Sequence, residues 1–400
     1  MSARAAEAWS KPPAVPETHY VSGLVYSDES VFADEKRRIF DRTWHLACHE
    51  SEVPEPYDFR TVDYVGTPLL VVRGADRRIR TFFNVCPHRG AKIVHELSGN
   101  TKRFTCFYHL WSFDAVGACT DIPRQEGYQT VGLKKDDVGL REVRTEIHVG
   151  LVFVNLDDQA TPLGQYLGKA LDAFEGPMTA GKGLEVFHYN RAIIQSNWKA
   201  WQETNLDVYH EFMHVLLRRT QMTAAPLEDR KVTVHPNGHT SIAGLRAKYE
   251  YYKGMQSRDD RLALPTLRAD DFIFGTVFPH VAVLARGTTM RIDVVTPLDA
   301  HRTLIEWRGL GVRGDSAEDR QARVRHHNQY WGPFGRNVPE DAYAAEAAEM
   351  GFGRGAARFQ VIARDEGGSG QDDGMLRAFY GEWSRRTGRP AANPSNAPMA

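Results

Sequence analysis

Two short segments that each pair a cysteine with a histidine constrain this 400-residue chain more than any other feature. The first is Cys86-Pro87-His88-Arg89-Gly90, and the second is Cys106-Phe107-Tyr108-His109. Each follows a strand-like run, Arg80–Val85 or Arg103–Thr105. We therefore expect two tight loops at strand ends, each presenting one sulfur and one imidazole.

The spacing of these residues indicates the kind of centre that they hold. Paired as Cys-x-His and Cys-x2-His, Cys86, His88, Cys106 and His109 match the ligands of a Rieske [2Fe–2S] cluster, in which one iron takes both sulfurs and the other both imidazoles. Structural zinc also accepts two Cys and two His, but zinc fingers usually present a cysteine pair and then a histidine pair. The mixed pairs favour the cluster, so the chain is expected to carry electrons at least.

Composition limits the partners that this chain can have. Charged residues make up 25% of it and the formal net charge is −1, so nothing favours nucleic acid or an anionic membrane as a partner. Met1–Pro13 lacks the apolar stretch of a signal peptide, and the apolar runs elsewhere are too short to span a bilayer. Besides the cluster cysteines only Cys48 and Cys119 remain, too few for a disulfide framework. We expect a cytoplasmic protein.

The pattern along the chain predicts an α+β protein. Residues 44–160 contain short β-like runs separated by Gly, Pro and Asp, which predicts a small all-β domain carrying the cluster. Residues 161–388 predict helices packed on an antiparallel sheet. Residues 1–43 are expected to form an arm and a short helix that pack on this second domain. Residues 389–400, rich in Pro, Ala and Asn, are expected to be a disordered tail.

A second motif falls in what we interpret as one long helix, Trp198 to Leu217. His210 and His214 are four residues apart, so on a helix they share a face and can share a metal. Asp207 lies just beneath them on that face. Two histidines and one carboxylate form the mononuclear iron triad that leaves coordination positions open for oxygen. Asn205 is a further candidate near such an iron, and is equally suited to a structural hydrogen bond.

Other interpretations of this motif stay open. His210-Glu211-x-x-His214 also satisfies the HExxH signature of zinc peptidases, with Glu211 as general base. The histidines would otherwise be satisfied core residues, and the chain a pure Rieske electron carrier. The upstream cluster ligands favour iron, because a peptidase has no use for an electron carrier.

Two features of the strands expected between residues 277 and 311 bear on ligands. Arg286 and Arg291 lie among apolar residues there, and an inward guanidinium would suit a carboxylate or sulfonate. Such arginines also commonly face solvent or pair with an acid such as Asp293. The glycines at 309, 311 and 314 match GxGxxG, but without a surrounding βαβ unit we interpret them as a strand-to-helix loop. Electrons then have to come from another protein.

Taken together, the two motifs resemble the oxygenase α subunit of the Rieske non-haem iron, ring-hydroxylating family over nearly the whole chain. The residues that carry the resemblance are Cys86, His88, Cys106, His109, Asp207, His210 and His214. It implies a Rieske domain followed by a helix-grip catalytic domain, with a [2Fe–2S] cluster and a mononuclear Fe(II). It also implies a third iron ligand near the C-terminus, which falls on Asp373, with Asp372 as the alternative. Alternatively, Asp372 and Asp373 are acids that only stabilise the N-terminus of a helix and bind no metal. One departure is that three residues, where many members have four, separate His210 from His214.

The resemblance further implies an assembly. A ferredoxin and/or flavin reductase would deliver electrons from NAD(P)H, and Asp207 would bridge a cluster histidine to an iron histidine of the next subunit. A closed head-to-tail interface of this kind generates a ring, here a homotrimer. The segment from His326 to Asn337 is similar to α subunits that pair with a small β subunit, so α3 and α3β3 both stay open. The implied reaction is O2-dependent hydroxylation of an organic substrate, first an aromatic acid and alternatively a small acid of the methanesulfonate type.

Overall fold

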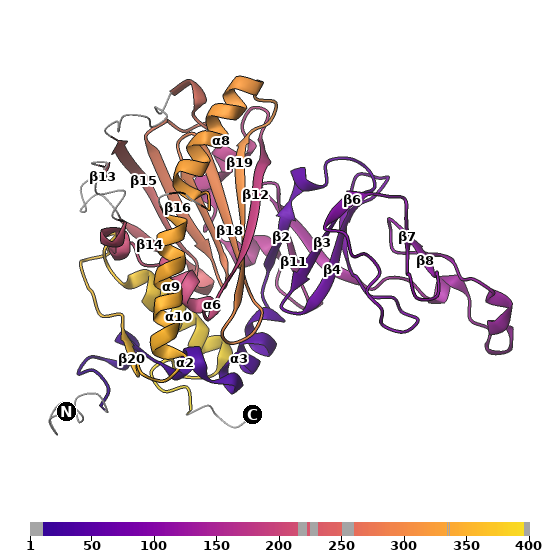
Figure 1. Cartoon of the computed structure of the whole chain (residues 1–400), viewed down its shortest axis with the longest axis horizontal. Helices are drawn as coiled ribbons and strands as arrows, with labels where there is room; N and C mark the ends of the chain where they lie inside the picture. The colour runs from indigo at the N-terminus through magenta and orange to yellow at the C-terminus, as the bar shows by residue number, and fades with distance from the viewer. Residues whose placement is uncertain are drawn as a thin grey trace. The chain divides into compact units, whose positions relative to one another are not determined.

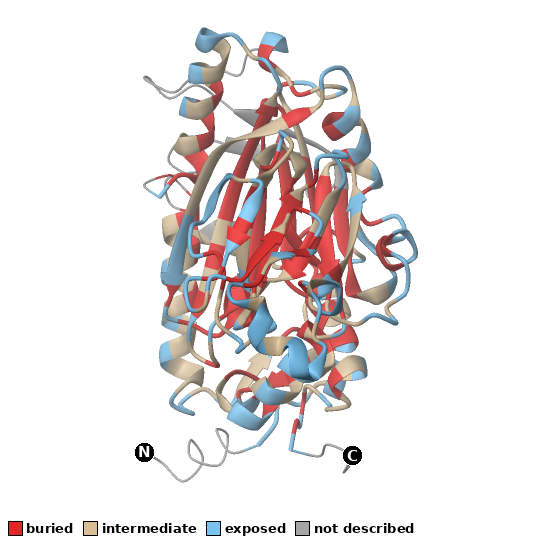
Figure 2. Cartoon of the chain, turned by 90° about the vertical axis from the view of Figure 1, so that its right-hand side faces the viewer, coloured by how far each residue is buried: buried red, intermediate tan, exposed pale blue. Residues whose placement is uncertain are grey.

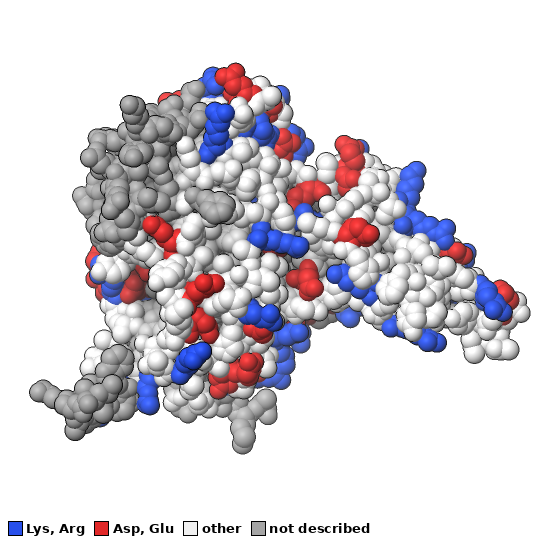
Figure 3. Space-filling model, in the orientation of Figure 1, with Lys and Arg blue, Asp and Glu red and all other residues white. Residues whose placement is uncertain are grey.

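The chain, as a computed structural model, is described for residues 11–214, 222–224, 231–249, 260–333, 335 and 337–395. It divides into two compact units, one of residues 1–40 and 164–400 and the other of residues 41–163 (Figure 1). On the face seen in Figure 3, acidic and basic side chains are interspersed, as the net charge of −1 leads one to expect. Among the described helices, none has the length and apolar character to cross a bilayer.

The unit of residues 41–163 consists of two antiparallel sheets, one in the order β2-β11-β10-β5-β4-β3-β6 and a smaller one of β7-β8-β9. Its core is formed by apolar side chains of both sheets, among them Leu70, Phe82 and Phe104, together with Cys86 and Cys106. The small all-β domain predicted from the sequence is therefore confirmed. Its strands are β2 (His45–His49), β3 (Asp58–Tyr64), β4 (Thr67–Arg73), β5 (Ile79–Phe83), β6 (Ser98–Asn100), β7 (Arg103–Thr105), β8 (Ser112–Asp114), β9 (Cys119–Asp121), β10 (Glu142–His148) and β11 (Leu151–Asn155).

The other unit is built on a large antiparallel sheet in the order β12-β19-β18-β17-β16-β15-β13, with β14 also paired to β15. Its strands are β12 (Leu184–Ile194), β13 (Met222–Ala224), β14 (Val232–Val234), β15 (Thr240–Tyr249), β16 (Asp271–Val277), β17 (Val281–Arg286), β18 (Thr289–Pro297) and β19 (Thr303–Val312). A separate pair joins β1 (Tyr20–Ser22) to β20 (Phe359–Val361). Every residue of β17 and β18 is buried, so this sheet is covered on both faces (Figure 2).

Helices cover this sheet, and α6, α8 and α9 matter most for the site. Helix α6 contacts β18, α8 contacts β18 and β19, and α9 contacts β12 and α6. The hydroxyl of Ser316 accepts from the backbone N–H of Asp319 and so caps the start of α8. Among the residues that the structure describes, the α-helices are α2 (Leu24–Ser27), α3 (Glu29–Glu35), α4 (Leu163–Leu167), α5 (Asp172–Thr179), α6 (Trp198–Thr204), α8 (Ala317–Trp331), α9 (Val338–Phe352) and α10 (Gly374–Thr387). The α+β class and the sheet-with-helices architecture predicted for this region are confirmed.

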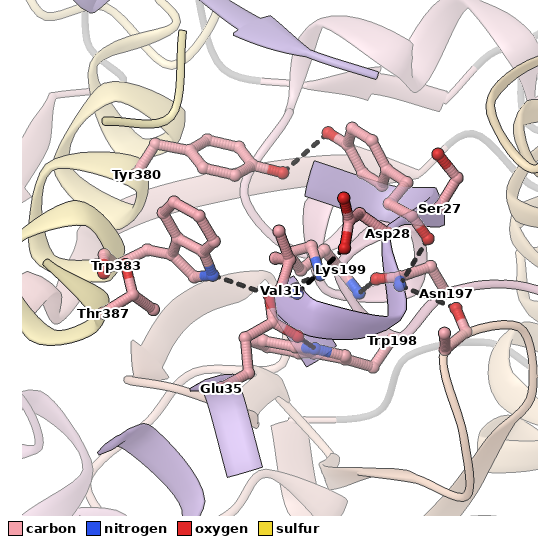
Figure 4. Close-up of polar contacts among 12 residues, drawn as sticks. Ser27, Asp28, Val31, Glu35, Asn197, Trp198, Lys199, Tyr380, Trp383 and Thr387 are labelled. Carbon is pink, nitrogen blue, oxygen red and sulfur yellow. Dashed lines mark hydrogen bonds and ion pairs between the residues drawn. The ribbon is translucent and has the colours of Figure 1, made fainter. Parts of the chain in front are cut away.

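The N-terminal helix α3 is held to this unit by a buried ion pair. Lys199 Nζ of α6 lies 2.6 Å from Glu35 Oε1 of α3, and both side chains are fully buried. The indole N–H groups of Trp198 and Trp383 also donate to the carboxylate of Glu35, at 2.8 and 2.7 Å. Figure 4 shows these groups converging from α3, α6 and α10. Each polar atom of the pair therefore has a partner, which is the condition for burying charge.

Two predictions about the course of the chain were wrong. Gly309 and Gly311 lie inside β19 rather than in a loop, and only Gly314, with φ of 74°, is in the turn before α8. Residues 389–395, predicted to be disordered, are held by specific bonds. Arg389 Nε donates to Asp34 at 2.8 Å, and the carbonyl of Ala391 accepts from the N–H of Ser22 at 2.9 Å. Residues 396–400 lie outside the described residues.

Candidate functional site

Two loops of the same backbone design present the first ligand set. In each loop the N–H of the cysteine, Cys86 or Cys106, donates to the carbonyl five residues on, at 2.8 Å in both cases. The residue four positions after the cysteine donates back to its carbonyl at 2.9 Å. That residue is left-handed in both loops, Gly90 with φ of 74° and Leu110 with φ of 60°. A left-handed leucine costs about 1 kcal/mol, which the closed loop has to offset.

These loops bring two thiols and two imidazoles together. Cys86 and Cys106 are buried with their thiols in hydrogen-bond contact, and backbone N–H groups also donate to the sulfur of Cys86. The rings of His88 and His109 lie 4.5 Å apart between centroids. His88 stacks on Trp111, with its Nδ1 buried and without a hydrogen-bond partner among the described residues. Such an atom is available to a metal, so the four residues fit a cluster with two sulfur and two nitrogen ligands.

A second candidate metal centre lies in the other unit. One ligand atom each from His210, His214 and Asp341 lies within 4.8 Å of the others. The carboxylate Oδ1 of Asp341 is 3.4 Å from His210 Nε2 and 3.5 Å from His214 Nε2. That oxygen is buried and has no hydrogen-bond donor among the described residues. Two histidines and one carboxylate are the donor set of mononuclear non-haem iron.

In each histidine, the hydrogen bond made by Nδ1 leaves Nε2 facing Asp341. His210 Nδ1 donates to the backbone carbonyl of Asp207. His214 Nδ1 bonds to Glu340 Oε2 at 2.8 Å. Metal-binding imidazoles characteristically give their second nitrogen to a carbonyl or carboxylate in this way, which leaves Nε2 for the metal.

The pKa values of the two imidazoles are shifted in opposite directions. Burial works to lower the pKa of His210, but the neighbouring carboxylate of Asp341 raises it above its ordinary value. At His214 burial prevails and lowers the pKa.

The third carboxylate differs from the one predicted. Asp373 lies at the start of α10, where its Oδ2 accepts from the N–H of Arg364 at 2.8 Å. Asp372 pairs with Arg377 at 2.7 Å. Both acids serve the start of α10, the alternative that the sequence had left open, and Asp341 replaces them beside the histidines. Because α9 packs on α6, the first turn of α9 delivers Asp341 to this place. The adjacent acids Glu340 and Asp341 at a helix start were the signal in the sequence.

The long helix predicted from Trp198 to Leu217 was also wrong. Helix α6 starts at the side-chain cap of Asn197 and ends at Thr204, and the 3₁₀ turn η6 (Tyr209–Met213) follows after a break. Thr204, Asn205 and Asp207 are residue types that favour helix ends over interiors. His210 and His214 therefore converge through a tight turn and not through α-helical periodicity. Residues 215–217 and the side chain of Glu211, the general base of the peptidase interpretation, lie outside the described residues.

A buried ion pair lies next to this centre. Arg291 Nε is 2.7 Å from Asp293 Oδ1, and Arg291 Nη2 also donates to Asn205 Oδ1 at 3.3 Å. Burial raises the pKa of Asp293 to about 6, although Arg291 acts in the opposite direction. Arg291 thus points inward but is paired with Asp293, as the sequence allowed. Arg286 is also buried, with its guanidinium over the rings of Phe272, Tyr330 and Trp331.

Comparisons with known proteins agree with both centres. Residues 43–134 match the family described as Rieske [2Fe–2S] domain, and residues 182–388 match the ring-hydroxylating α subunit catalytic domain. The chain is 45% identical to the α subunit of 2-aminobenzenesulfonate 2,3-dioxygenase of Alcaligenes sp., over 98% of this chain and 99% of that one. It is 38% identical to the hydroxylase α subunit of methanesulfonate monooxygenase of Methylosulfonomonas methylovora, over 100% and 99% of the two chains.

Solved structures show the same fold. The naphthalene 1,2-dioxygenase of Rhodococcus sp. with indole bound aligns with a TM-score of 0.78 at 22% identity, over 92% of this chain and 94% of that one. A quaternary ammonium Rieske monooxygenase in complex with L-carnitine aligns with a TM-score of 0.76 at 21% identity, over 93% and 98%. The two-unit architecture is thus shared along nearly the full length.

Proposed function

This chain is a member of the ring-hydroxylating Rieske oxygenase α-subunit family, and from that premise we propose that it hydroxylates an organic sulfonate with O2. The observation that carries the oxygenase assignment is the convergence of His210, His214 and Asp341 in a chain that also holds the four Rieske residues. The two full-length relatives reported above both act, by name, on sulfonates. They favour a sulfonate as the acid group of the aromatic or small acid expected from the sequence.

Each group at the mononuclear centre has a proposed role. His210, His214 and Asp341 would hold iron, which supplies O2 activation when bound, while the [2Fe–2S] cluster supplies electrons. The carbonyl of Asp207 and the carboxylate of Glu340 hold the two imidazoles in the tautomer that leaves Nε2 free. Asn205 positions the Arg291 guanidinium beside the centre.

The same proposal covers the path of the electrons. We propose that a ferredoxin or flavin reductase passes electrons from NAD(P)H to the cluster. The carboxylate of Asp207 would then bridge a cluster histidine of one subunit to the iron site of the next, within a head-to-tail trimer. Its support is the position of Asp207, whose own carbonyl already holds His210. The proposed trimer is either α3 alone or α3β3 with a small β subunit.

Metal analysis and O2 uptake together test the proposal. The purified protein is expected to contain about two acid-labile sulfides and about three irons per chain. With a reductase present, O2 uptake should rise on adding 2-aminobenzenesulfonate or methanesulfonate more than on adding terephthalate or anthranilate. Zinc without sulfide would overturn the oxygenase. An iron-loaded enzyme that responds only to the carboxylates would overturn the sulfonate.

A further inference from the structure

The face of the large sheet that carries Arg291 and Asp293 also carries Trp307 and Gly309. Arg291 is the register partner of Gly309, and Asp293 is the partner of Trp307, so the four positions share one face. His188 on β12 pairs with Gly309 and joins the same face. This face is the one that α6 and α8 cover, and Arg291 on it contacts Asn205, which precedes His210 in the chain.

Gly309 allows α8 to place a histidine directly against the sheet. A Cβ at position 309 would come within 2.7 Å of His327 Cε1 and 3.0 Å of His188 Cβ. Any side chain there would push His327 away, since real Cβ atoms do not approach neighbours below 3.0 Å. The rings of His188 and His327 consequently pack with their centroids 4.9 Å apart.

Three nitrogen atoms on this face are buried without a hydrogen-bond partner among the described residues. They are His188 Nδ1, His327 Nε2 and Trp307 Nε1. His327 is fully buried, and Trp307 nearly so. Buried polar atoms in proteins are almost always bonded, so three unbonded nitrogens on one face indicate a place where a ligand bonds.

A continuous line of packed side chains joins this pair of histidines to the candidate iron site. The His327 ring lies 5.4 Å from the ring of Trp331, and Trp331 in turn lies under the Arg291 guanidinium at 5.4 Å. Arg291 donates to Asn205, which stands shortly before His210 in the chain. The two histidines therefore share one packed surface with Arg291 and Asn205.

Neutral imidazoles at this place can donate hydrogen bonds to an acid group. Burial, His188 and the positive charge of Arg291 together hold the pKa of His327 well below its ordinary value, and burial also lowers the pKa of His188. The nearby cation is Arg291, which is already paired with Asp293. A sulfonate offers three oxygens that accept hydrogen bonds, and imidazole and indole nitrogens are suitable donors.

We propose that His188 and His327 bind the acid group of the substrate, with Trp307 as a further donor. The inference rests on the proposed oxygenase function and assigns the specificity of that site to two residues. Anchored there, the acid group sets which carbon of the substrate lies nearest His210, His214 and Asp341.

Calorimetric binding to the metal-loaded protein tests the assignment without relying on turnover. The probes are 2-aminobenzenesulfonate and methanesulfonate as sulfonates, anthranilate as the matching carboxylate, and aniline as a neutral ring. His327→Phe keeps a planar ring but removes both nitrogens. We expect it to weaken sulfonate binding at least about ten-fold, the effect of losing a hydrogen bond to a charged group, and to change aniline binding less than about two-fold. Preference between the sulfonates and anthranilate in the wild type identifies which acid the site takes.

The matched control is His326→Phe, the preceding residue of α8: its Nδ1 contacts a threonine, as that of His327 does, but its ring packs on Tyr330 and not on His188. It should leave sulfonate affinity unchanged. If His327→Phe fails to fold or to load metal, His188→Phe on β12 decides, with the same expected loss. Unchanged sulfonate affinity in a folded, loaded variant, or an equal loss for aniline, would overturn the assignment. If the wild-type protein binds neither the sulfonates nor anthranilate, the proposed sulfonate function is overturned together with the assignment. If the wild type binds a sulfonate and the histidine variant binds it equally well, only the assignment is overturned.

Discussion

At His210 and His214, the hydrogen bond made by one ring nitrogen decides which nitrogen is left for a metal. Asp207 and Glu340 hold the Nδ1 atoms, and both Nε2 atoms face Asp341. Asp207 acts here through its backbone carbonyl, a role that the type of its side chain does not predict, and Glu340 stands directly before Asp341 at the start of α9. The ligands and their orienting groups therefore have to be tested separately.

Asp341→Asn is expected to abolish iron binding at the mononuclear centre, because the amide replaces the only charged oxygen ligand of the triad. Turnover should fall at least about 100-fold while the visible spectrum of the cluster persists. Iron analysis and that spectrum are the two measurements. Asp373→Asn serves as the control and should keep the iron. Loss of iron in Asp373→Asn with retention in Asp341→Asn would restore the original assignment.

Glu340→Gln should act more mildly than loss of a ligand. The amide can still bond to His214 Nδ1, but it no longer stabilises the imidazole by its charge. Such orienting carboxylates typically contribute about 10- to 100-fold to metal affinity, and a loss in that range is expected. Competition with a chelator measures it. An affinity equal to that of the wild type would show that Glu340 merely contacts the ring.

At the scale of elements, buried polar groups attach the short N-terminal helices to the large sheet unit. The Glu35 carboxylate joins α3 to α6 and α10 through Lys199 and two tryptophans. Close by, Glu203 of α6 accepts hydrogen bonds from Tyr26, Tyr380 and Gln360, which come from α2, α10 and β20. The Glu35 carboxylate is paired with a lysine whereas that of Glu203 is bonded by hydroxyl and amide groups, so they respond to different changes.

Lys199→Met should destabilise the protein by about 3 to 5 kcal/mol, because it leaves the Glu35 carboxylate buried without its countercharge. The double variant Lys199→Met with Glu35→Gln should recover part of that loss, since no buried charge remains. Urea unfolding measures both. Arg37→Met, which removes an exposed partner of Asp34, is the control and should cost less than about 1 kcal/mol. Equal losses for the buried and exposed pairs would contradict the argument.

The raised pKa of Glu203 predicts that the free energy of unfolding depends on pH. Burial raises its pKa to about 7, although the hydrogen bonds of Tyr26 and Tyr380 and the charge of Lys199 oppose this. A group whose pKa is raised in the folded state contributes its stability below the unfolded value, 4.5, and loses it as pH rises through about 7. Over that window the wild type should lose up to about 3 kcal/mol relative to Glu203→Gln. Parallel pH profiles of the unfolding free energy in the two proteins would refute this.

At the scale of the whole molecule, each compact unit holds its own centre. The cluster residues Cys86 and Cys106 belong to the core of the unit of residues 41–163. The triad lies wholly in the other unit, on residues of η6, the position after it, and α9. Loading of one centre should consequently not require the other.

Cys86→Ser is expected to lose acid-labile sulfide and the cluster spectrum but to retain about one iron per chain at the triad. The unit of residues 41–163 should also unfold at a lower temperature, because the cluster binds only its folded form. Scanning calorimetry with sulfide and iron analysis checks both. His210→Ala is the converse control, keeping the cluster and losing turnover. Loss of all iron in Cys86→Ser would show that the centres assemble together.

Local spacing explains which parts of the site were accessible from the sequence. Cys86 and His88, Cys106 and His109, and His210 and His214 are each separated by only a few residues, so covalent geometry alone keeps the members of a pair within reach of one another. The predictions failed where the partner is distant in the chain. The resemblance placed the third ligand on Asp373, and no local rule shows that Asp341 is the acid that lies beside the histidines. The pattern of the segment from Trp198 to Leu217 also suggested one α-helix, although Asn205 and Asp207 are residue types that favour helix ends, and α6 ends at Thr204.

The sequence by itself determined the two kinds of centre, the all-β domain around the first and the antiparallel sheet with helices around the second. It did so because ligand type, short spacing and hydrophobic period are local properties of the chain. Only the tertiary structure decided that Asp341 lies beside His210 and His214, that Arg291 is paired with Asp293, and that Gly309 lets His327 lie beside His188. Those choices depend on which helix packs on which face of the sheet, and packing joins residues that the sequence keeps far apart.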